Sequence, residues 1–181
     1  MNYIGQSVPR LEDNRLLRGE GTFVDDVKLP GMAAMAILRS PHAHAHIRSI
    51  DLAGARSCPG VIDAFSAVDI VNDFKGKLPL IPLRLTPFPG FERFLQPPIA
   101  AEITRFVGEP VAVVVAETRA LAEDAMAQIA VDYDILSAVT TRQQALAGEV
   151  LVHEAAGENL AKRYHVSRGD ADAAFVNAPY K

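Results

Sequence analysis

The sequence is poor in cysteine, with Cys58 alone among 181 residues. A single cysteine cannot form an internal disulfide, and it cannot supply the thiolates of an iron–sulfur cluster or a zinc knuckle. Such low cysteine use fits a reducing compartment, so we expect a cytoplasmic protein.

Long apolar runs are also missing, since the longest, such as residues 32–38, have only seven residues. A membrane-spanning helix needs about 20 apolar residues, and the charged amino terminus lacks the apolar core of a signal peptide. The 22 acidic residues outnumber the 18 basic ones, giving a net charge of −4. The short apolar runs therefore predict no membrane span. Because nucleic-acid binding depends on clustered positive charge, we also expect no nucleic-acid partner.

A glycine-rich phosphate loop is absent as well, which removes the standard cradle for a nucleotide. Acidic pairs could act as acid–base or metal-binding groups. However, Asp25 and Asp26 point to opposite faces if extended, while Glu123 and Asp124 fall on the solvated face of a predicted helix. We interpret both pairs as structural.

Glu109 is a more attractive candidate acid, because it lies in a tight Gly108-Glu109-Pro110 break between two apolar strand runs. Breaks of this kind often carry functional residues. A plain bend accounts for the same residues, since Gly108 permits an unusual backbone conformation and Pro110 keeps the preceding residue extended. We therefore expect Glu109 to be solvated rather than catalytic.

Three histidines alternate in the segment "SPHAHAHIRS", at His42, His44 and His46. On a strand, two neighbours of this row could share a zinc ion, but the row spans about 13 Å and all three could not. Further ligands would have to come from residues without ligand-like spacing, namely Cys58, His153 and His165. We favour a solvated or hydrogen-bonded histidine edge, and a metal site at His42 and His44 is the alternative.

Apolar periodicity and turn residues divide the chain into short elements. In the first thirty residues we expect a loop, a short strand and a turn closed by Pro30 and Gly31. We then expect strands at residues 32–39, 43–48, 61–65 and 130–136, with two more runs inside 104–118 broken at 108–110. The strand, helix, strand order at 111–136 predicts a βαβ-like crossover in which residues 111–115 are buried on both sides.

Short helices are expected between these strands, at residues 52–60, 67–73 and 119–130, and ending at Leu146. One face of the helix 119–130 carries its apolar residues, Leu121, Ala122, Ala125, Met126 and Ile129. Polar residues that precede the helices can cap them, namely Asp51, Ser66, Thr118, a capping box of Thr140 with Gln143, and Asp170 before one last turn.

Residues 74–98 contain half of the chain's 12 prolines. Proline cannot donate a ladder hydrogen bond, so this segment cannot form regular sheet. An irregular segment of this length is typically functional, partner-facing or disordered.

Four segments taken in order carry a family resemblance: "PRLEDNRLLRGEGTFVDDVKLPGM", "ILRSPHAHAHIRSIDLAGARSCPGVIDAFSAVDI", "RFVGEPVAVVVAETRALAEDAMAQIAVDYD" and "NLAKRYHVSRGDADAAFVNA". Together they resemble the amino-terminal part of a molybdenum hydroxylase large subunit, of the xanthine dehydrogenase, aldehyde oxidase and carbon monoxide dehydrogenase family. The resemblance implies an α/β (α+β) hammerhead domain, a mixed sheet with a few packed helices. It implies an extension at residues 1–18, the hammerhead domain at 19–147, and at 148–181 a linker or the start of the molybdenum-cofactor region.

The resemblance also implies that this region is structural within a molybdenum-dependent oxidoreductase that hydroxylates an aldehyde, an N-heterocycle or carbon monoxide. The molybdenum–pterin cofactor belongs to other domains of the full-length subunit, and iron–sulfur clusters and FAD belong to further domains or subunits, which are the expected partners. We therefore expect no catalytic, cofactor-binding or metal residues in this chain, with His42 and His44 structural. His46 stands where the family motif often has arginine. The alternative is a stand-alone binding module that uses the proline-rich segment 74–98 or a His42/His44 metal site.

Overall fold

The computed structural model describes residues 3–73, 80–81 and 90–180, and the chain divides into two compact units, Met1–Ala33 and Ala34–Lys181. The first unit contains helix α1 (Asp13–Leu17) and the 3-10 turn η1 (Val24–Asp26). The short strand expected here is wrong, because the Asp26 carboxylate accepts from the Phe23 amide at 2.9 Å and closes a turn instead. The turn at Pro30 and Gly31 is confirmed, with the Met32 amide donating to the Leu29 carbonyl at 3.1 Å.

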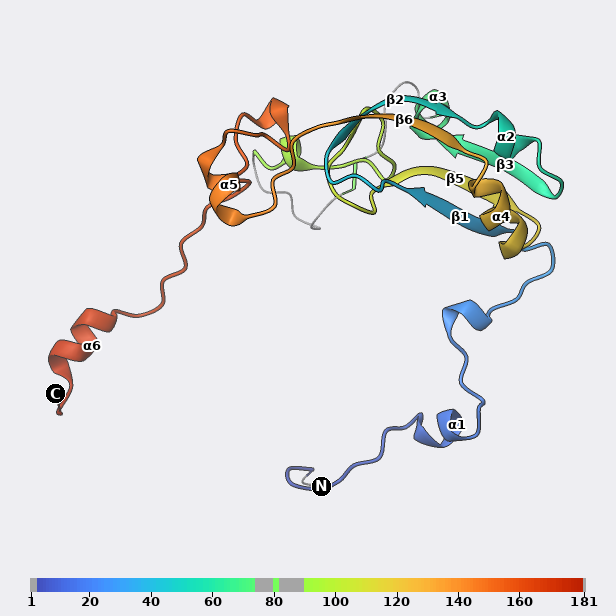
Figure 1. The fold of residues 1–181 in the computed structure, drawn as a ribbon. Coiled ribbons are helices and arrows are strands. Elements are labelled where there is room, and N and C mark those ends of the chain that lie inside the picture. The colour runs from blue at the N-terminus through green and yellow to red at the C-terminus, as the bar shows by residue number, and fades with distance from the viewer. Residues whose placement is uncertain (1–2, 74–79, 82–89, 181) are drawn as a thin grey trace. The chain divides into compact units, whose positions relative to one another are not determined.

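The second unit is built on two three-stranded sheets (Figure 1). Sheet A has the order β1-β5-β3, and sheet B has the order β4-β2-β6. The strands are β1 (Ala34–Arg39), β2 (Ala45–Asp51), β3 (Val61–Ser66), β4 (Ile103–Thr104), β5 (Pro110–Ala116) and β6 (Ala130–Ile135). All these pairings are antiparallel.

The predicted βαβ-like crossover is therefore wrong, although the expected combination of sheet and packed helices is confirmed. Helix α4 (Arg119–Met126) does connect β5 to β6, but it carries the chain from sheet A into sheet B, where β6 pairs with β2. The helix ends about one turn before the predicted residue 130, because residue 130 already begins β6. Strand β5 is central in sheet A, but the expected burial of residues 111–115 on both sides is confirmed only in part, because Val114 is buried whereas Val113 and Val115 are only half-buried.

The remaining helices are α2 (Ala53–Arg56), α3 (Ala67–Asp73), α5 (Arg142–Ala147) and α6 (Ala171–Asn177), with 3-10 turns η2 (Glu92–Phe94) and η3 (Glu154–Ala156). Helix α2 is shorter than the predicted 52–60.

Several predicted caps are confirmed. The Thr118 hydroxyl accepts from the Leu121 amide at 3.3 Å, and the Asp170 carboxylate accepts from the Ala173 amide at 2.9 Å. Asp51 likewise accepts from the first amide of α2 at 2.9 Å.

Two other caps differ from the prediction. The capping box of α5 lies one residue later than expected, with Thr141 and Gln144 exchanging bonds at 3.2 and 3.1 Å. At α3 the Ser66 hydroxyl donates to the Asp69 carboxylate at 2.8 Å instead of accepting from the helix.

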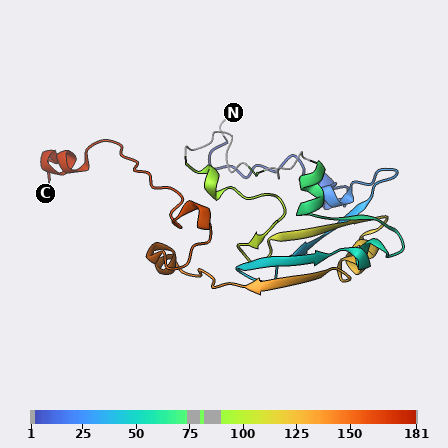
Figure 2. The same cartoon turned by 90° about the horizontal axis from the view of Figure 1, so that it is seen from above.

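The core lies between one face of sheet A and helices α2 and α4, which pack at the same end of the sheets (Figure 2). It is made mainly of small side chains: Ala36, Ala55, Ala64, Ala112, Val114, Ala116, Ala122 and Ala125. The predicted apolar face of α4 is confirmed, because Ala122 and Ala125 are buried in this core and the other members are packed against it. Small residues let the helix approach the sheet closely, so the core is thin.

The proline-rich segment 74–98 falls partly outside the described residues, which exclude 74–79 and 82–89. Of its described part, η2 buries Phe94, and the Ile81 amide donates to the Gln96 carbonyl at 2.8 Å. Within residues 3–73, 80–81 and 90–180, no helix is long and apolar enough to cross a membrane.

Candidate functional site

Buried polar groups gather where the turn after β1 meets the loop between β4 and β5. Ser40 joins the two segments: its amide donates to the Glu109 carbonyl and its carbonyl accepts from the Gly108 amide, both at 2.8 Å. The Ser40 hydroxyl accepts from the His42 amide at 3.1 Å and lies 3.3 Å from the buried Thr104 hydroxyl. This junction fixes the sharp turn that leads from sheet A into sheet B.

The histidine row does not form one strand face as predicted, because β2 begins only at Ala45 and only His46 lies within it. Proline at position 41 and the Ser40 bonds turn the chain before that point. His44 is buried, and its Nδ1 lies 2.8 Å from the Ser137 carbonyl. A carbonyl can only accept, so Nδ1 donates and is occupied.

His42 packs against an aromatic ring instead. Its imidazole meets the Tyr133 ring edge to face, with centroids 4.9 Å apart. In the part of the chain that the structure describes, no three His, Cys, Asp or Glu side chains are arranged to hold a metal ion. The hydrogen-bonded interpretation of His44 is thus supported by a specific partner.

Glu109 corrects the sequence-based expectation most directly, because its side chain is buried, with only 1% exposed. Gly108 has φ of +91°, and the chain reverses there so that the carboxylate folds back under its own loop. One carboxylate oxygen, Oε2, accepts from the Arg105 amide. The other, Oε1, is a buried side-chain atom without a hydrogen-bond partner among the described residues.

Burial raises the pKa of Glu109 above its ordinary value, while the amides of Arg105 and Phe106 and the Arg105 charge act in the opposite direction. The desolvation effect is the largest because a carboxylate loses its hydration inside the loop. No sequence signal gives the direction of this side chain. The only hint is an acid inserted between two apolar strands.

Arg105 connects this loop to the segment after α5, a link that sequence reasoning missed. Its Nε donates to the Val152 carbonyl at 3.1 Å, and its Nη1 donates to the Ile103 carbonyl at 3.2 Å. The adjacent His153 has its pKa lowered by burial, and the neighbouring Arg105 charge and the His44 imidazole lower it further. Residues 150–153 are therefore held against the sheet end by a guanidinium.

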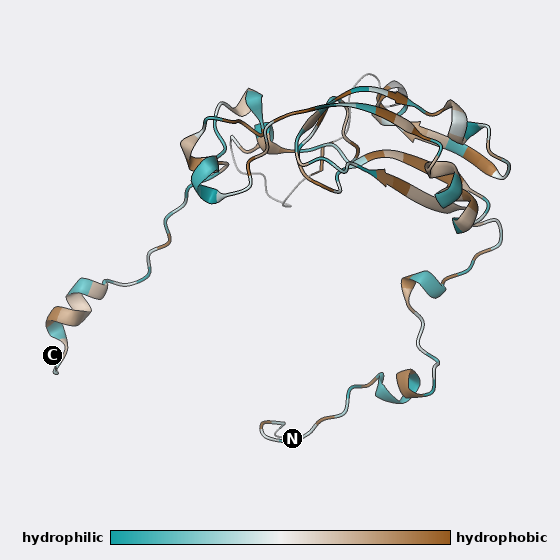
Figure 3. Cartoon of the chain, in the orientation of Figure 1, coloured by the Kyte–Doolittle hydropathy of each residue, from teal (hydrophilic) through white to brown (hydrophobic). Residues whose placement is uncertain are grey.

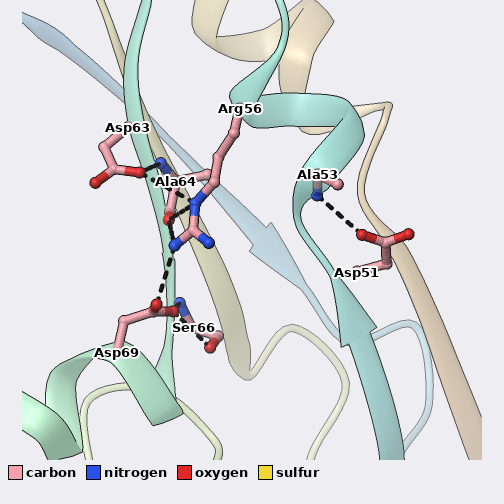
Figure 4. Close-up of polar contacts among 7 residues, drawn as sticks. All are labelled: Asp51, Ala53, Arg56, Asp63, Ala64, Ser66 and Asp69. Atoms are coloured by element: carbon pink, nitrogen blue, oxygen red, sulfur yellow. Dashed lines mark hydrogen bonds and ion pairs between the residues drawn. The ribbon is translucent and has the colours of Figure 1, made fainter.

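A second polar cluster surrounds Arg56 along the outer edge of β3 (Figure 4). Its guanidinium donates twice to the Ala64 carbonyl, from Nε at 3.1 Å and from Nη2 at 2.7 Å. It also pairs with Asp63 at 3.1 Å and Asp69 at 2.9 Å. Burial acts to raise the pKa of Asp69, but its bonds from Ser66 and Arg56 outweigh this effect and lower it.

Both clusters are arranged to hold segments together. A general base must reach the proton that it removes, whereas Glu109 is closed off inside its loop. Arg56 is fully engaged in joining α2, β3 and α3. Chemically, both clusters therefore act as clamps.

Comparison with known proteins gives the family of this fold. Residues 18–137 match the family "Aldehyde oxidase and xanthine dehydrogenase, a/b hammerhead domain". The nicotine 6-hydroxylase large subunit of Paenarthrobacter nicotinovorans is 37% identical over 179 residues, which are 99% of this chain and 21% of that protein. The carbon monoxide dehydrogenase large chain of Afipia carboxidovorans is 42% identical over 127 residues, 70% of this chain and 14% of that one.

A solved structure agrees with these matches. Quinoline 2-oxidoreductase from Pseudomonas putida 86 superposes with a TM-score of 0.71 and 43% identity, covering 85% of this chain and 19% of that one. This chain spans only about a fifth of the length of such relatives. Because the family match covers most of its length, the chain belongs to the aldehyde oxidase and xanthine dehydrogenase α/β hammerhead domain family.

Proposed function

We propose that this chain is the amino-terminal structural domain of a molybdenum hydroxylase large subunit. The observation that carries the proposal is the similarity over 99% of the chain to a nicotine 6-hydroxylase large subunit. The complete enzyme would catalyse oxidative hydroxylation of an aldehyde, an N-heterocycle or carbon monoxide. Relatives named for nicotine, quinoline and carbon monoxide support this range of substrates.

The domain's own contribution is to hold segments in place. The Ser40, Arg105 and Glu109 contacts tie both sheets to residues 150–153, the part of the chain that leads to its carboxyl end. We propose no catalytic, cofactor-binding or metal role for any residue of this chain. The proposed division is an extension at 1–18, the hammerhead domain at 19–147 and a connecting segment at 148–181.

A molybdenum–pterin cofactor is implied by the family, and among the described residues no group of side chains is arranged to hold its metal ion. A protein metal site needs several converging ligands, and the described residues offer no such group. Glu109 Oε1, the buried side-chain oxygen without a partner in the described part of the chain, is enclosed within its own loop. Other domains of the subunit would therefore hold the cofactor, with iron–sulfur and FAD domains or subunits as electron-accepting partners.

The proposed location is the cytoplasm, which suits a chain whose one cysteine, Cys58, is a free thiol.

The test is the product of the native reading frame. We expect a product several times longer than 181 residues that purifies with molybdenum and oxidises at least one of the three substrate classes, while the 181-residue chain alone is colourless and free of stoichiometric molybdenum or iron. A reading frame that ends at residue 181, with a product that captures a partner through residues 74–98 or binds metal at His42 and His44, would favour a stand-alone binding module instead.

A further inference from the structure

The two border strands of sheet A differ in how their outer sides are covered. A border strand leaves alternate N–H and C=O groups without ladder partners, and these groups pair readily with another strand. On β3 the outer carbonyl of Ala64 is already occupied by two donors from Arg56, which lies against this edge (Figure 4). The β3 edge is therefore closed to a further strand.

Among the described residues of the second unit, none covers the outer side of β1 in a comparable way. Ser40 directs its amide and carbonyl toward the β5 side, where they bond to Glu109 and Gly108. Because neighbouring residues of a strand direct these groups to opposite sides, Met35 and Ile37 direct theirs outward. Within the described part of the second unit, residues 34–73, 80–81 and 90–180, no hydrogen bond beyond the ladder to β5 involves the backbone of either residue.

The same strand borders an apolar face. Met35 and Asp63 lie opposite Val115, and Ile37 and Phe65 lie opposite Val113, so these side chains share the face of sheet A that points away from α4, and five of them, all but Asp63, are apolar. Figure 3 shows β1 and β5 as largely hydrophobic strands. We call these five residues the outer face.

Exposure distinguishes the outer face from the core face. Val114, on the core face, is 0% exposed, whereas its neighbours Val113 and Val115 are only half-buried and Met35 is 59% exposed. An apolar face beside an unpaired apolar edge is a recognised binding surface and an aggregation hazard when left open. No lysine or aspartate in β1 discourages pairing, since Arg39 at its end is the strand's one charged residue.

We propose that the outer edge of β1 and the outer face form a docking surface for an extended apolar segment from the remainder of the large subunit, which adds to sheet A beside β1. This inference rests on the proposed function. The matched nicotine 6-hydroxylase subunit is about five times longer than this chain, so most of such a subunit lies outside it. A segment in the same polypeptide has the advantage of high effective concentration over a second copy of the domain.

Amide hydrogen exchange tests the proposal at single residues. In the full-length subunit, the amides of Met35 and Ile37 should exchange more slowly than in the 181-residue chain by about 100-fold or more, as expected for amides that join a core sheet. Amides of Ala36 and Leu38 face β5 and should be protected in both proteins. Equal, fast exchange of Met35 and Ile37 in both proteins overturns the proposal. Protection already present in the 181-residue chain also overturns it, because the occupant would then lie within this chain.

A pair of matched substitutions gives a second measurement. Met35→Lys in the full-length subunit should abolish the added protection at Ile37, whereas Ile62→Lys on β3, at a similar 61% exposure, should leave it unchanged. Equal effects of the two substitutions would contradict docking at β1. The molybdenum content of the unmodified subunit tests the proposed function separately from the docking surface. A subunit that holds molybdenum but shows fast exchange at Met35 and Ile37 refutes the docking surface and leaves the proposed function intact.

Discussion

Substitution of Glu109 separates the two interpretations of the Gly108-Glu109-Pro110 break. A solvated glutamate could be replaced with a change in unfolding free energy of no more than about 0.5 kcal/mol. In the structure, however, its carboxylate is buried and accepts from the amide of Arg105. Glu109→Ala leaves this donor without an acceptor, and at about 1–3 kcal/mol for an unsatisfied buried group, the expected loss is about 1–3 kcal/mol.

The pH dependence of Glu109→Gln supplies the second half of the test. Burial raises the folded-state pKa of Glu109 above its ordinary 4.5, so the folded state binds this proton more tightly than the unfolded state. By linkage, the group's contribution to stability is present at low pH and falls as pH rises from about 4.5 through the folded-state pKa. Glutamine keeps the acceptor and never ionises, so Glu109→Gln should gain stability relative to the wild type over that rise.

Urea unfolding followed by circular dichroism, at several pH values between about 4 and 8, measures both effects. Glu102→Gln is the matched control, because Glu102 is exposed and lies in the approach to the same loop. It should change the unfolding free energy by no more than about 0.5 kcal/mol at any of these pH values. A Glu109→Ala protein as stable as the wild type, or a constant difference between wild type and Glu109→Gln across the series, would refute the buried-carboxylate reasoning.

Other parts of the structure give further expectations. Arg56→Met should lower the unfolding free energy by about 1–3 kcal/mol, mainly because the Ala64 carbonyl loses a charged donor. The half-exposed ion pairs of Arg56 add little. A change under about 0.5 kcal/mol in a urea titration would contradict the role of Arg56 as a clamp. The pKa of Asp69 is lowered, so its contribution to stability is present above its ordinary pKa of 3.8 and is lost as pH falls through the folded-state value. The stability of Asp69→Asn should therefore fall less steeply with acid than that of the wild type. The same fall of stability with acid in both proteins would contradict this expectation. Gly108→Val should lower stability by about 1–3 kcal/mol through backbone strain at φ +91°, as no atom crowds the added Cβ, and an unchanged melting temperature would exclude that strain. Calorimetric titration with zinc should find no site with a Kd tighter than about micromolar, a binding free energy near −8 kcal/mol, because His44 is already hydrogen-bonded. A nanomolar site that is lost in His44→Ala would overturn this expectation.

Features that depend on nearby residues could be predicted from the sequence. The Thr118 and Asp170 caps follow from residue type and position alone, since each side chain reaches an amide only three residues away. The alternation of apolar residues on α4 likewise identified its packing face. The α5 capping box was predicted one residue too early, because the two adjacent threonines each have a glutamine three residues later.

Features that depend on distant contacts could not be predicted in the same way. The partner of His44 is the Ser137 carbonyl, 93 residues along the chain, and neither position carries a signal for the other. The burial of Glu109 requires the Ser40 turn to bond to its loop, again across distant sequence. A strand, helix, strand order is compatible with one sheet or two, and only the pairing of β6 with β2 decides between them.

The composition of the core explains why such distant polar contacts matter here. Burial stabilises in proportion to apolar area, and alanine offers little area per residue. In a core built largely from alanine, the segments are therefore held in place to a large extent by hydrogen bonds, such as those of Arg56 and Arg105. Other apolar side chains lie on the outer face, including Met35, and its exposed area stabilises nothing until another surface covers it. We infer that this distribution suits a domain whose full stability is reached only within a larger subunit.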